Sequence, residues 1–546
     1  MKAADEVIEV NREEIQAMLE RKREALGEED YEKLQKLLRA FSYLSDIIGE
    51  KDTTISQLRA LLMKPSTEKT EKVLERAGVE PSVRIPAPSK EVKPKPGHGR
   101  NSAMEYCGAV RIPLPHRSLK PGDRCPECLR GKVYQQKEPG LRIRVVGQAP
   151  IAATVYELER LRCNLCGEIF EAKAPEGVGE EKYDESAGAM IALLKYGSGF
   201  PFYRLAGLEE NLGIPLPAST QWEIVEEVAE RIRPVFEELI RQAAQGEVFH
   251  NDDTKMKILS LTRESASPRG SPEEESSLRE RRGVFTSGIV STQQGQRVAL
   301  FFTGRRHAGE NFAQVLAQRA AGLPAPIQVA DALSWNFPKL PEKLKVMVGN
   351  CNAHARRRFV DVVSNFPEEC RYVLESFAEV YGYDAQTEER GLSPEERLRF
   401  HQEHSGPVME KLQGWFTAQF AEKKVEPNSG LGSAIQYCLR HWPELTLFLH
   451  QAGAPLDNNI VERALKKAVL HRKNSLFYKT LNGAKVGDLF MSLIHTCELN
   501  SANAFDYLTE LQKHAEEVAK NPPAWMPWNY TNTLERSNVA SREAPA

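Results

Sequence analysis

Three acidic residues, in three differently built contexts, are the positions of this sequence best suited to metal-dependent chemistry. Asp252 lies in the strand-like run EVFHNDDTKMKIL, Asp331 ends the apolar run IQVAD, and Glu462 lies in NNIVERALKKAV, a helical pattern rich in Lys and Arg. A single aspartate at a strand end is usually structural. Three converging carboxylates, however, offer the hard oxygen ligands that Mg²⁺ prefers, and a pair of Mg²⁺ ions can promote in-line phosphoryl transfer on a nucleic acid backbone.

The first aspartate has an immediate acidic neighbour. Asp252 and Asp253 lie side by side in one strand-like run. Because successive side chains of a strand point to opposite faces, only one of the two carboxylates should face a shared metal site. The strand pattern alone does not say which of the two it is.

The segment around both aspartates changes to strand-like periodicity over 246–336. Three strand-like runs, EVFHNDDTKMKIL, VFTSGIVST and RVALFFT, precede the helical run AGENFAQVLAQRAAG and a fourth strand-like run, IQVAD. The first two runs flank a polar segment, 263–282, with the composition of a disordered loop. Three strands, a helix and a strand is the order of an RNase H-like core, which we expect over 246–354. The helical pattern of 355–453 predicts an insertion, and 454–515 would hold the glutamate-bearing helix and the end of the core.

Two CxxC motifs predict a structural zinc site. CPEC (125–128) and CNLC (163–166) each present two thiolates to one ion, and two such knuckles complete a tetrahedral site of the zinc-ribbon type. The predicted ligands, in a domain at 101–175, are Cys125, Cys128, Cys163 and Cys166. Cys107 or His116 could replace one thiolate, and reduced structural or redox-active cysteines are the alternative to zinc.

The N-terminal residues 1–64 predict a coiled coil. A heptad pattern can be followed from Leu34 to Leu62 with one break, at Lys51, and it favours a short dimerising coiled coil over an amphipathic surface helix. Residues 65–100 are polar, basic and rich in proline, which is typical of an extended, flexible linker.

Helical periodicity returns over 184–245. Within it, LAGLEENLGIPLPASTQWEIVEEV predicts a helix, a turn at Gly213–Pro217 and a second helix capped by Ser219 or Thr220. This is the outline of a helix-turn-helix, whose second helix can enter the major groove of DNA. Ordinary helical packing explains the same outline about as well, so both interpretations stay open.

Basic residues cluster near the second aspartate and the glutamate in sequence. The candidates for contact with DNA are His354, Arg356, Arg357, Arg463, Lys466, Lys467, Arg472 and Lys473. The net charge of −3 argues weakly against nucleic acid binding, but binding depends on local patches rather than on net charge. Solvated helix faces are the alternative for either cluster. Cys351 and His354 also form a CxxH spacing that is compatible with zinc, with no second pair nearby in sequence.

Length and composition favour a multidomain α+β protein. The 546 residues suffice for three or four domains, ending in a C-terminal tail at 516–546. No apolar run reaches about 18 residues, so we expect no membrane span. The acidic N-terminus lacks the apolar region of a secretory signal. Four of the nine cysteines lie in CxxC pairs, which fits metal binding in a reducing cytoplasm better than a disulfide framework.

Taken in order, these segments resemble the large TnpC-type transposase of the insertion-sequence-66 (IS66) family. The resemblance rests on HGRNSAMEYCGA (98–109), the CxxC pairs, GFPFYRLAGLEENLGIPLPAST, NDDT (251–254), IQVADALSWN, GNCNAHARRRF (349–359), PLDNNIVERALKKAVLHRKNSLFY (455–478), GAKVGDLFMSLIHTCELN and WMPWNY (525–530). It covers nearly the whole chain and implies a DDE transposase with an RNase H-like core. The family's acidic pair followed by threonine implies that Asp252, rather than Asp253, acts together with Asp331 and Glu462.

The resemblance implies an enzyme that binds two Mg²⁺ or Mn²⁺ ions at these carboxylates. It would cleave DNA at the ends of its element and transfer the freed 3′-OH into target DNA. We expect a homo-oligomer, at least a dimer, in the bacterial cytoplasm at the nucleoid, with small accessory proteins of the same element as candidate partners. One alternative is a domesticated DNA-binding protein, which the three intact acidic positions argue against; another is an RNase H-like nuclease without strand transfer.

Overall fold

The structure is a computed structural model. It describes residues 69–79, most of 111–178, 181–543 apart from 265–280, 282 and 342–343, and the single residues Arg21, Tyr31 and Gln35. Contacts divide the chain into two units, Met1–Pro81 and Ser82–Ala546. The predicted coiled coil lies outside the described residues except for those three helical positions. Within the predicted linker the structure shows a helix, α4 (Thr70–Arg76), whose sequence TEKVLER is rich in good helix formers.

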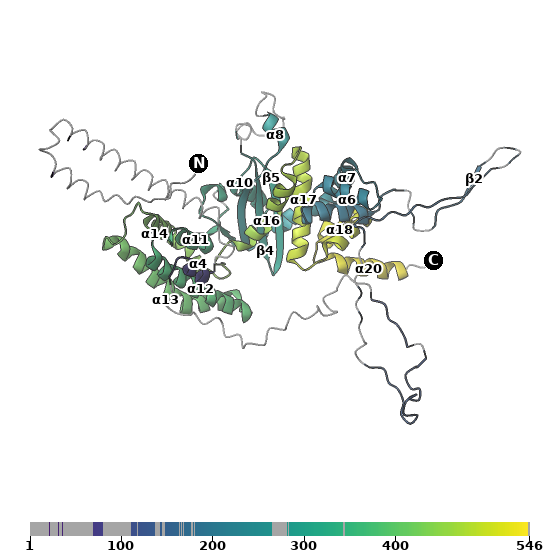
Figure 1. Cartoon of the computed structure of the whole chain (residues 1–546), viewed down its shortest axis with the longest axis horizontal. Coiled ribbons are helices and arrows are strands. Elements are labelled where there is room, and N and C mark those ends of the chain that lie inside the picture. The colour runs from purple at the N-terminus through teal and green to yellow at the C-terminus, as the bar shows by residue number, and fades with distance from the viewer. Residues whose placement is uncertain are drawn as a thin grey trace. The chain divides into compact units, whose positions relative to one another are not determined.

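A five-stranded mixed sheet forms the centre of the second unit (Figure 1). Its order is β5-β4-β3-β6-β7, and its strands are β3 (Val248–Lys255), β4 (Phe285–Gln293), β5 (Gln296–Gly304), β6 (Ile327–Ala330) and β7 (Met347–Asn350). The first three are antiparallel neighbours, whereas β6 and β7 run parallel to β3. This topology is consistent with the RNase H-like core expected from the sequence. The sequence did not predict β7, because its four residues end in Gly349 and Asn350, which are uncommon in strands.

Helices on the sheet bring in the remaining core residues. Helix α10 (Ala308–Leu316) connects β5 to β6 and packs through Phe312, whose ring lies 4.9 Å from that of Phe249 on β3. Helix α16 (Asn459–Ser475) packs against β3 and β4, and α17 (Leu481–Leu499) packs against β5 (Figure 1). Short helices α8 (Leu259–Glu264) and η3 (Ser334–Asn336) follow β3 and β6.

The edge strand β5 is covered by a ladder of polar side chains from α17 and the residue after it. Alternate backbone N–H groups of β5, at Arg297, Ala299, Phe301 and Thr303, donate hydrogen bonds to the side chains of Asn500, Thr496, Ser492 and Asp488, respectively. The acceptors recur every four residues and therefore share one helix face, while the donors recur every two residues along one strand edge. The ladder gives hydrogen-bond acceptors to backbone N–H groups of an edge strand that could otherwise pair with another strand.

The helical segment 184–245 packs beside α17. It consists of α5 (Glu185–Ala192), the π-helix η2 (Leu193–Gly197), α6 (Phe202–Asn211) and α7 (Ala218–Ala243). Helix α7 begins directly after Pro217, so neither Ser219 nor Thr220 caps it as predicted. It contacts α5, α6, α17 and α19 and carries more glutamates than arginines. We therefore do not assign α7 to the DNA groove, where the phosphates attract basic side chains.

The segment predicted as a helical insertion is helical in the structure. Its elements are α11 (Asn352–Val362), α12 (Pro367–Glu389), α13 (Pro394–Ala421), α14 (Gly430–Arg440), α15 (Trp442–Leu445) and η4 (Leu447–Leu449). The rings of Phe359 on α11 and Phe416 on α13 stack 5.7 Å apart inside this group. A single residue, Cys351, separates β7 from α11, so the insertion is joined to the sheet at the C-terminal end of β7.

The C-terminal segment is packed into the fold and is not the tail expected from the sequence. It forms α18 (Ala504–Lys513), α19 (Ala515–Lys520), η5 (Pro522–Trp525) and α20 (Tyr530–Glu543). Trp525 is 1% exposed, and the hydroxyl of the buried Tyr507 donates to its carbonyl oxygen at 2.8 Å. Within the described part of the chain, no helix is long and apolar enough to cross a membrane.

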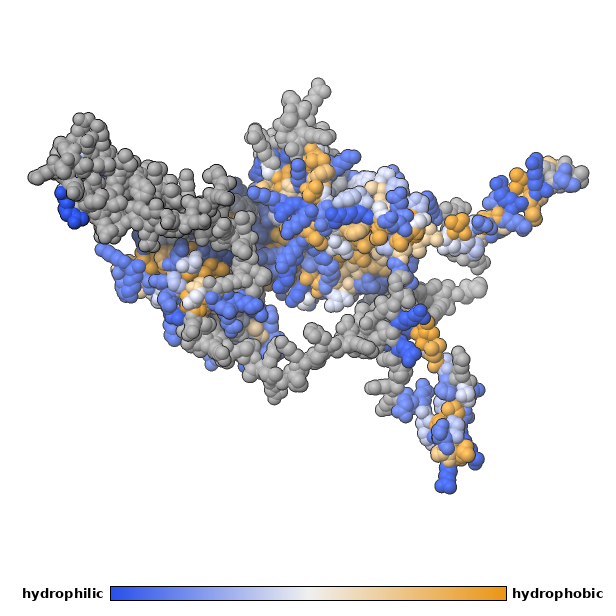
Figure 2. Space-filling model, viewed as in Figure 1, coloured by the Kyte–Doolittle hydropathy of each residue, from blue (hydrophilic) through white to orange (hydrophobic). Residues whose placement is uncertain are grey.

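The described part of 111–178 contains one short hairpin, β1 (Arg160–Arg162) with β2 (Ile169–Glu171). Large apolar side chains in this segment are exposed: Ile112, Leu114, Leu129, Tyr134, Val155, Tyr156, Leu161, Ile169 and Phe170. The space-filling view shows apolar patches along it (Figure 2). The described residues of this segment therefore bury little apolar surface.

Candidate active site

The parallel pairing of β3 and β6 brings the first two carboxylates together. The register pairs Phe249 with Gln328 and His250 with Val329. Continued by two residues, it places Asp252 beside Asp331, which directly follows the last residue of β6. Two aspartates separated by 79 positions in sequence thus become neighbours because they hold equivalent places on adjacent strands.

A buried amide joins these two aspartates. The Nδ2 of Asn336, in η3, donates to an Oδ1 of Asp331 and lies 3.5 Å from Oδ1 of Asp252. Its backbone carbonyl accepts hydrogen bonds from the side chains of Asn251 and Gln328 at 2.7 and 2.8 Å. Because these two amides come from β3 and β6, Asn336 is fixed to both strands that carry the aspartates.

The convergence of carboxylates changes their proton affinity. Burial raises the pKa of Asp252 to about 7, and repulsion from Asp331 and Glu462 acts in the same direction. Burial also raises the pKa of Asp331, while the nearby His354 lowers it. A partly buried group of carboxylate oxygens that repel one another is a donor set that fits a divalent cation, whose charge would relieve the repulsion.

Asn458 fixes the helix that carries Glu462. Glu462 lies in the first turn of α16, and Asn458 is the residue before that helix. The buried Asn458 side chain donates from Nδ2 to the carbonyl of Asn251 at 3.1 Å and pairs with Nδ1 of His250 at 3.1 Å. Its backbone N–H donates to Sγ of Cys351, 3.2 Å away. One residue thus ties the start of α16 to β3 and to the end of β7.

A glycine allows α16 to approach the sheet. Gly288 of β4 is paired with Asp252 in the antiparallel register. A Cβ atom at this position would lie 3.0 Å from Leu465 and 3.1 Å from Val461, both on the buried face of α16. The missing side chain therefore lets the glutamate-bearing helix pack directly over the strand position of the first aspartate.

Asp253 points to the other side of β3, at the start of α10. Its Oδ1 accepts the hydroxyl of Ser287 at 2.6 Å, and its Oδ2 accepts the backbone N–H of Ala308 at 3.0 Å and pairs with Nδ1 of His307 at 2.9 Å. This carboxylate accepts a backbone N–H that has no partner within the helix, and its negative charge interacts favourably with the positive N-terminal end of α10. The hydrogen bonds of Asp253 therefore hold α10 against the sheet.

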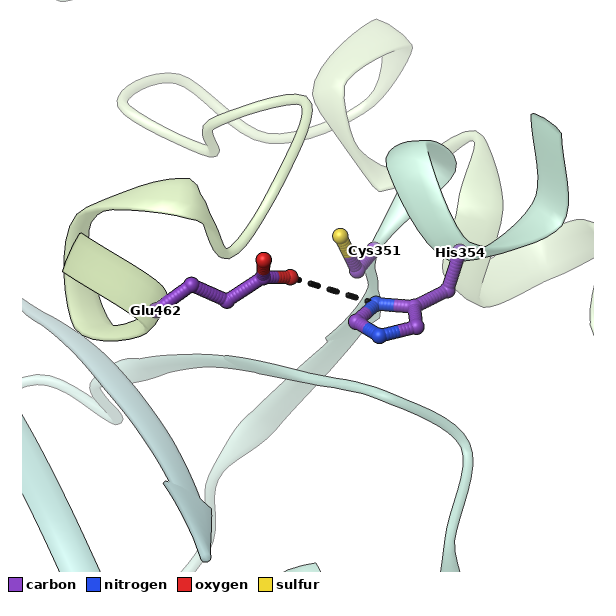
Figure 3. A group of neighbouring side chains, drawn as sticks. All are labelled: Cys351, His354 and Glu462. Atoms are coloured by element: carbon purple, nitrogen blue, oxygen red, sulfur yellow. Dashed lines mark ion pairs between the residues drawn. The ribbon is translucent and has the colours of Figure 1, made fainter. Parts of the chain in front are cut away.

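His354 and Cys351 lie next to Glu462 (Figure 3). The Nδ1 of His354 is 3.7 Å from Oε1 of Glu462, and Cys351 Sγ, a His354 ring nitrogen and a Glu462 oxygen all lie within 4.8 Å of one another. Cys351 is fully buried, and burial raises the pKa of its thiol to about 12. The CxxH pair, which has no second pair nearby in sequence, has a carboxylate as its neighbour in the fold.

The structure places the predicted DNA-contacting residues in different surroundings. Arg357, Arg463, Lys466 and Lys473 are exposed. Arg356 is buried. Lys467 forms an ion pair with Glu498 at 2.6 Å, and Arg472 donates to the hydroxyl of Thr254 and the carbonyl of Lys255.

The predicted zinc ligands are described in part. Cys125, Cys128 and Cys166 are free thiols, whereas Cys163 lies outside the described residues. The backbone N–H of Gly131 donates to Sγ of Cys128 at 3.4 Å. This hydrogen bond and a second one from the backbone of Arg130 lower the pKa of the Cys128 thiol. Backbone N–H groups directed at a sulfur stabilise its thiolate form, which is the form that binds metal.

Comparison with known proteins identifies the family. A family model described as the IS66 family of transposases matches residues 181–486, which include Asp252, Asp331 and Glu462. The chain belongs to the IS66 transposase family. Membership implies a DDE-type phosphoryl-transfer enzyme that binds DNA and uses divalent metal.

Two relatives come from Sinorhizobium fredii (strain NBRC 101917 / NGR234). The uncharacterized protein y4jD is 26% identical, over 79% of this chain and 83% of its own length. The uncharacterized protein y4hP is 24% identical, over 68% of this chain and 67% of its own length. Similarity to these two relatives covers more of the chain than the matched family model does.

Three residues of the site were missed from the sequence. Asn336 and Asn458 stand near Asp331 and Glu462 in sequence, but asparagines before or in short helices are ordinarily capping residues. Gly288 gave no signal at all, since its role depends on a helix more than 170 positions away. Only their contacts in the fold show what these residues position.

Proposed function

We propose that this protein is the transposase of an insertion sequence, which cleaves DNA at the ends of its own element and joins the freed 3′-OH ends to target DNA. The observation that carries the proposal is the convergence of Asp252, Asp331 and Glu462 from two parallel strands and a helix. Membership of a DDE transposase family supports the same reading.

Asp252, Asp331 and Glu462 would hold a pair of Mg²⁺ ions, or Mn²⁺ in their place. When bound, such ions polarise the scissile phosphate, promote ionisation of the attacking water or 3′-OH and stabilise the leaving oxygen. The chain supplies the orientation: Asn336 holds the two aspartates at a fixed separation, and Asn458 holds the start of α16 against β3. Neither cleavage nor strand transfer needs a covalent protein–DNA intermediate.

DNA would approach the carboxylates along the exposed basic side chains. Arg463 and Lys466 lie on α16 within four residues of Glu462, and Arg357 lies on α11 close to His354. Such residues neutralise phosphates and place the duplex without reading its sequence. The proposed coiled coil at 1–64 would pair two chains, and the proposed zinc ribbon would help to hold the element ends.

The test is an end-cleavage and strand-transfer assay on labelled DNA carrying the ends of the element. Asp252→Asn, Asp331→Asn and Glu462→Gln each remove one negatively charged ligand while nearly conserving shape. Each variant should bind end DNA about as well as the parent, and lose on the order of 10³-fold or more in cleavage and joining, because the lost ligand helps to stabilise charge that develops in the transition state.

The matched control is Asp253→Asn, a change of the same chemistry at the adjacent residue. Its folded fraction should keep most of its activity, since its carboxylate lies against α10. Full activity in the Glu462→Gln variant would refute the assignment of the trio. Cleavage without joining would identify a nuclease, and specific binding without either reaction in the unmodified chain would identify a DNA-binding protein that has lost its catalysis.

A further inference from the structure

Cys351, His354 and Glu462 form a cluster of ligand types that magnesium catalysis does not call for. A thiol, an imidazole nitrogen and a carboxylate oxygen lie within 4.8 Å of one another (Figure 3). Magnesium prefers oxygen ligands, whereas sulfur and imidazole ligands favour zinc and related transition metals. The cluster therefore differs in ligand chemistry from the Asp252–Asp331 pair. Glu462 belongs to the cluster and also lies near the two aspartates.

The fold directs the three ligand atoms at one point. Cys351 is the residue before α11, and His354 lies in the first turn of that helix, so both ligands leave the same helix end. Glu462 comes from the first turn of α16. Both helix ends carry partial positive charge from their free N–H groups, which favours a carboxylate and acts against the burial that raises the pKa of the Cys351 thiol. In addition, the N–H of Asn458 donates to Cys351 Sγ at 3.2 Å.

Small side-chain movements would close this cluster around an ion. In a tetrahedral zinc site with bonds of about 2.0–2.3 Å, ligand atoms are about 3.5 Å apart. The separation between His354 Nδ1 and Glu462 Oε1 is already 3.7 Å. That Nδ1 atom is buried and has no hydrogen-bond partner among the described residues. The side chains of His354 and Glu462 are 26% and 31% exposed, which gives an ion access from solvent.

We propose that Cys351, His354 and Glu462 form a binding site for Zn²⁺, and that zinc bound there inhibits DNA cleavage by withdrawing Glu462 from Mg²⁺. Three protein ligands leave one position for water, the composition of an exchangeable site and not of a closed structural one. Zinc competes well against magnesium for such ligands because thiolate and imidazole donors favour Zn²⁺, whereas Mg²⁺ prefers oxygen donors. The inhibitory part rests on the proposed transposase function; the binding part does not.

The binding test measures zinc per chain in the full-length protein, by elemental analysis after equilibration with zinc and gel filtration. Cys351→Ala and His354→Ala should each contain one zinc ion fewer per chain than the parent. Cys370→Ala is the matched control, since it removes another buried free cysteine, on α12, and should keep the parent's zinc content. Cobalt substitution gives a second readout: the sulfur-to-cobalt absorption of the parent should decrease in the Cys351→Ala variant and remain in the control.

The inhibition test compares, within each variant, Mg²⁺-dependent cleavage with and without added zinc. The zinc concentration that halves cleavage should be at least ten-fold higher for His354→Ala than for the parent. Asp252→Asn should still bind the ion while it fails to cleave, so loss of the function and loss of the site are separable. Zinc content equal to the parent's in both Cys351→Ala and His354→Ala would overturn the proposal. Circular dichroism identifies any variant that fails to fold, and the partly exposed His354 then provides the decisive substitution.

Discussion

At the scale of single residues, two adjacent aspartates have opposite surroundings. Asp252 is half-buried among other carboxylates, and desolvation and repulsion raise its pKa to about 7. Asp253, one residue later, accepts hydrogen bonds from Ser287 and from the start of α10. The first carboxylate is therefore costly for the fold and suited to a cation, whereas the second stabilises the fold.

This contrast predicts opposite effects on stability. Without Mg²⁺ at pH 8, Asp252→Asn should leave the free energy of unfolding unchanged or raise it, because it removes a partly desolvated charge from a group of carboxylates that repel one another. Asp253→Asn should lower it by about 1–2 kcal/mol, because a donating amide then faces donors. Urea denaturation of both variants measures the difference. A larger loss of stability for Asp252→Asn than for Asp253→Asn would contradict the proposed division of roles.

At the scale of elements, the positions of α16 and α17 decide the geometry of the core. Gly288 lets α16 approach β4, and Asn458 fixes its first turn. Helix α17 is held against β5 by its ladder of polar side chains, in which Asp488 is the charged member. Oxygens of Asp488 accept the backbone N–H and the hydroxyl of Thr303, both at 2.6 Å.

The buried carboxyl group of Asp488 should make the free energy of unfolding depend on pH. Burial raises its pKa from 3.8 in the unfolded chain to about 7, although the bonds from Thr303 act to lower it. The folded state therefore binds the proton more tightly, so this group's contribution is fully present below about pH 4 and is lost as the pH rises towards 7. The loss should be on the order of a few kcal/mol. In Asp488→Asn this component should disappear, and parallel curves of unfolding free energy against pH for the two proteins would contradict it.

At the scale of the whole molecule, the chain combines a well-packed core with a segment that buries little. Residues 181–486 match the transposase family and contain the sheet, the insertion and the carboxylates. The described part of 111–178 instead exposes most of its large apolar side chains. A segment with so small a core commonly depends on a bound metal for its stability. Cys125 and Cys128, which are free thiols, would be two ligands of the proposed zinc ion.

If the proposed zinc ribbon forms, loss of its metal should change this segment alone. Replacing Cys125 and Cys163 together by Ser should remove one zinc ion per chain and increase proteolytic cleavage within 111–178. The core should remain folded, because its sheet and helices lie at 185–543, outside this segment, and the ion proposed at Cys351 should be retained. Limited proteolysis followed by mass spectrometry locates the cleavage sites. Unchanged zinc content in the double variant would exclude the ribbon site.

The sequence by itself determined the family, the order of the core elements and the three candidate carboxylates. These follow from local patterns: the alternation of strands, the helical periodicity around Glu462 and the ordered motifs of the chain. It did not predict the four-residue strand β7, the start of α7 after Pro217 or the packing of the C-terminal helices. Short elements carry little pattern, and helix ends depend on neighbouring contacts.

Only the tertiary structure decided which side chains meet. The register of β3 against β6 places Asp252 beside Asp331, and the pleat of β3 turns Asp253 towards α10. Asn336 and Asn458 acquire their positioning roles from buried hydrogen bonds to residues 84 and 207 positions away. The CxxH pair gains Glu462 in the same way. Contacts between residues so far apart are set by packing and strand pairing, which leave no periodic signal in either local segment.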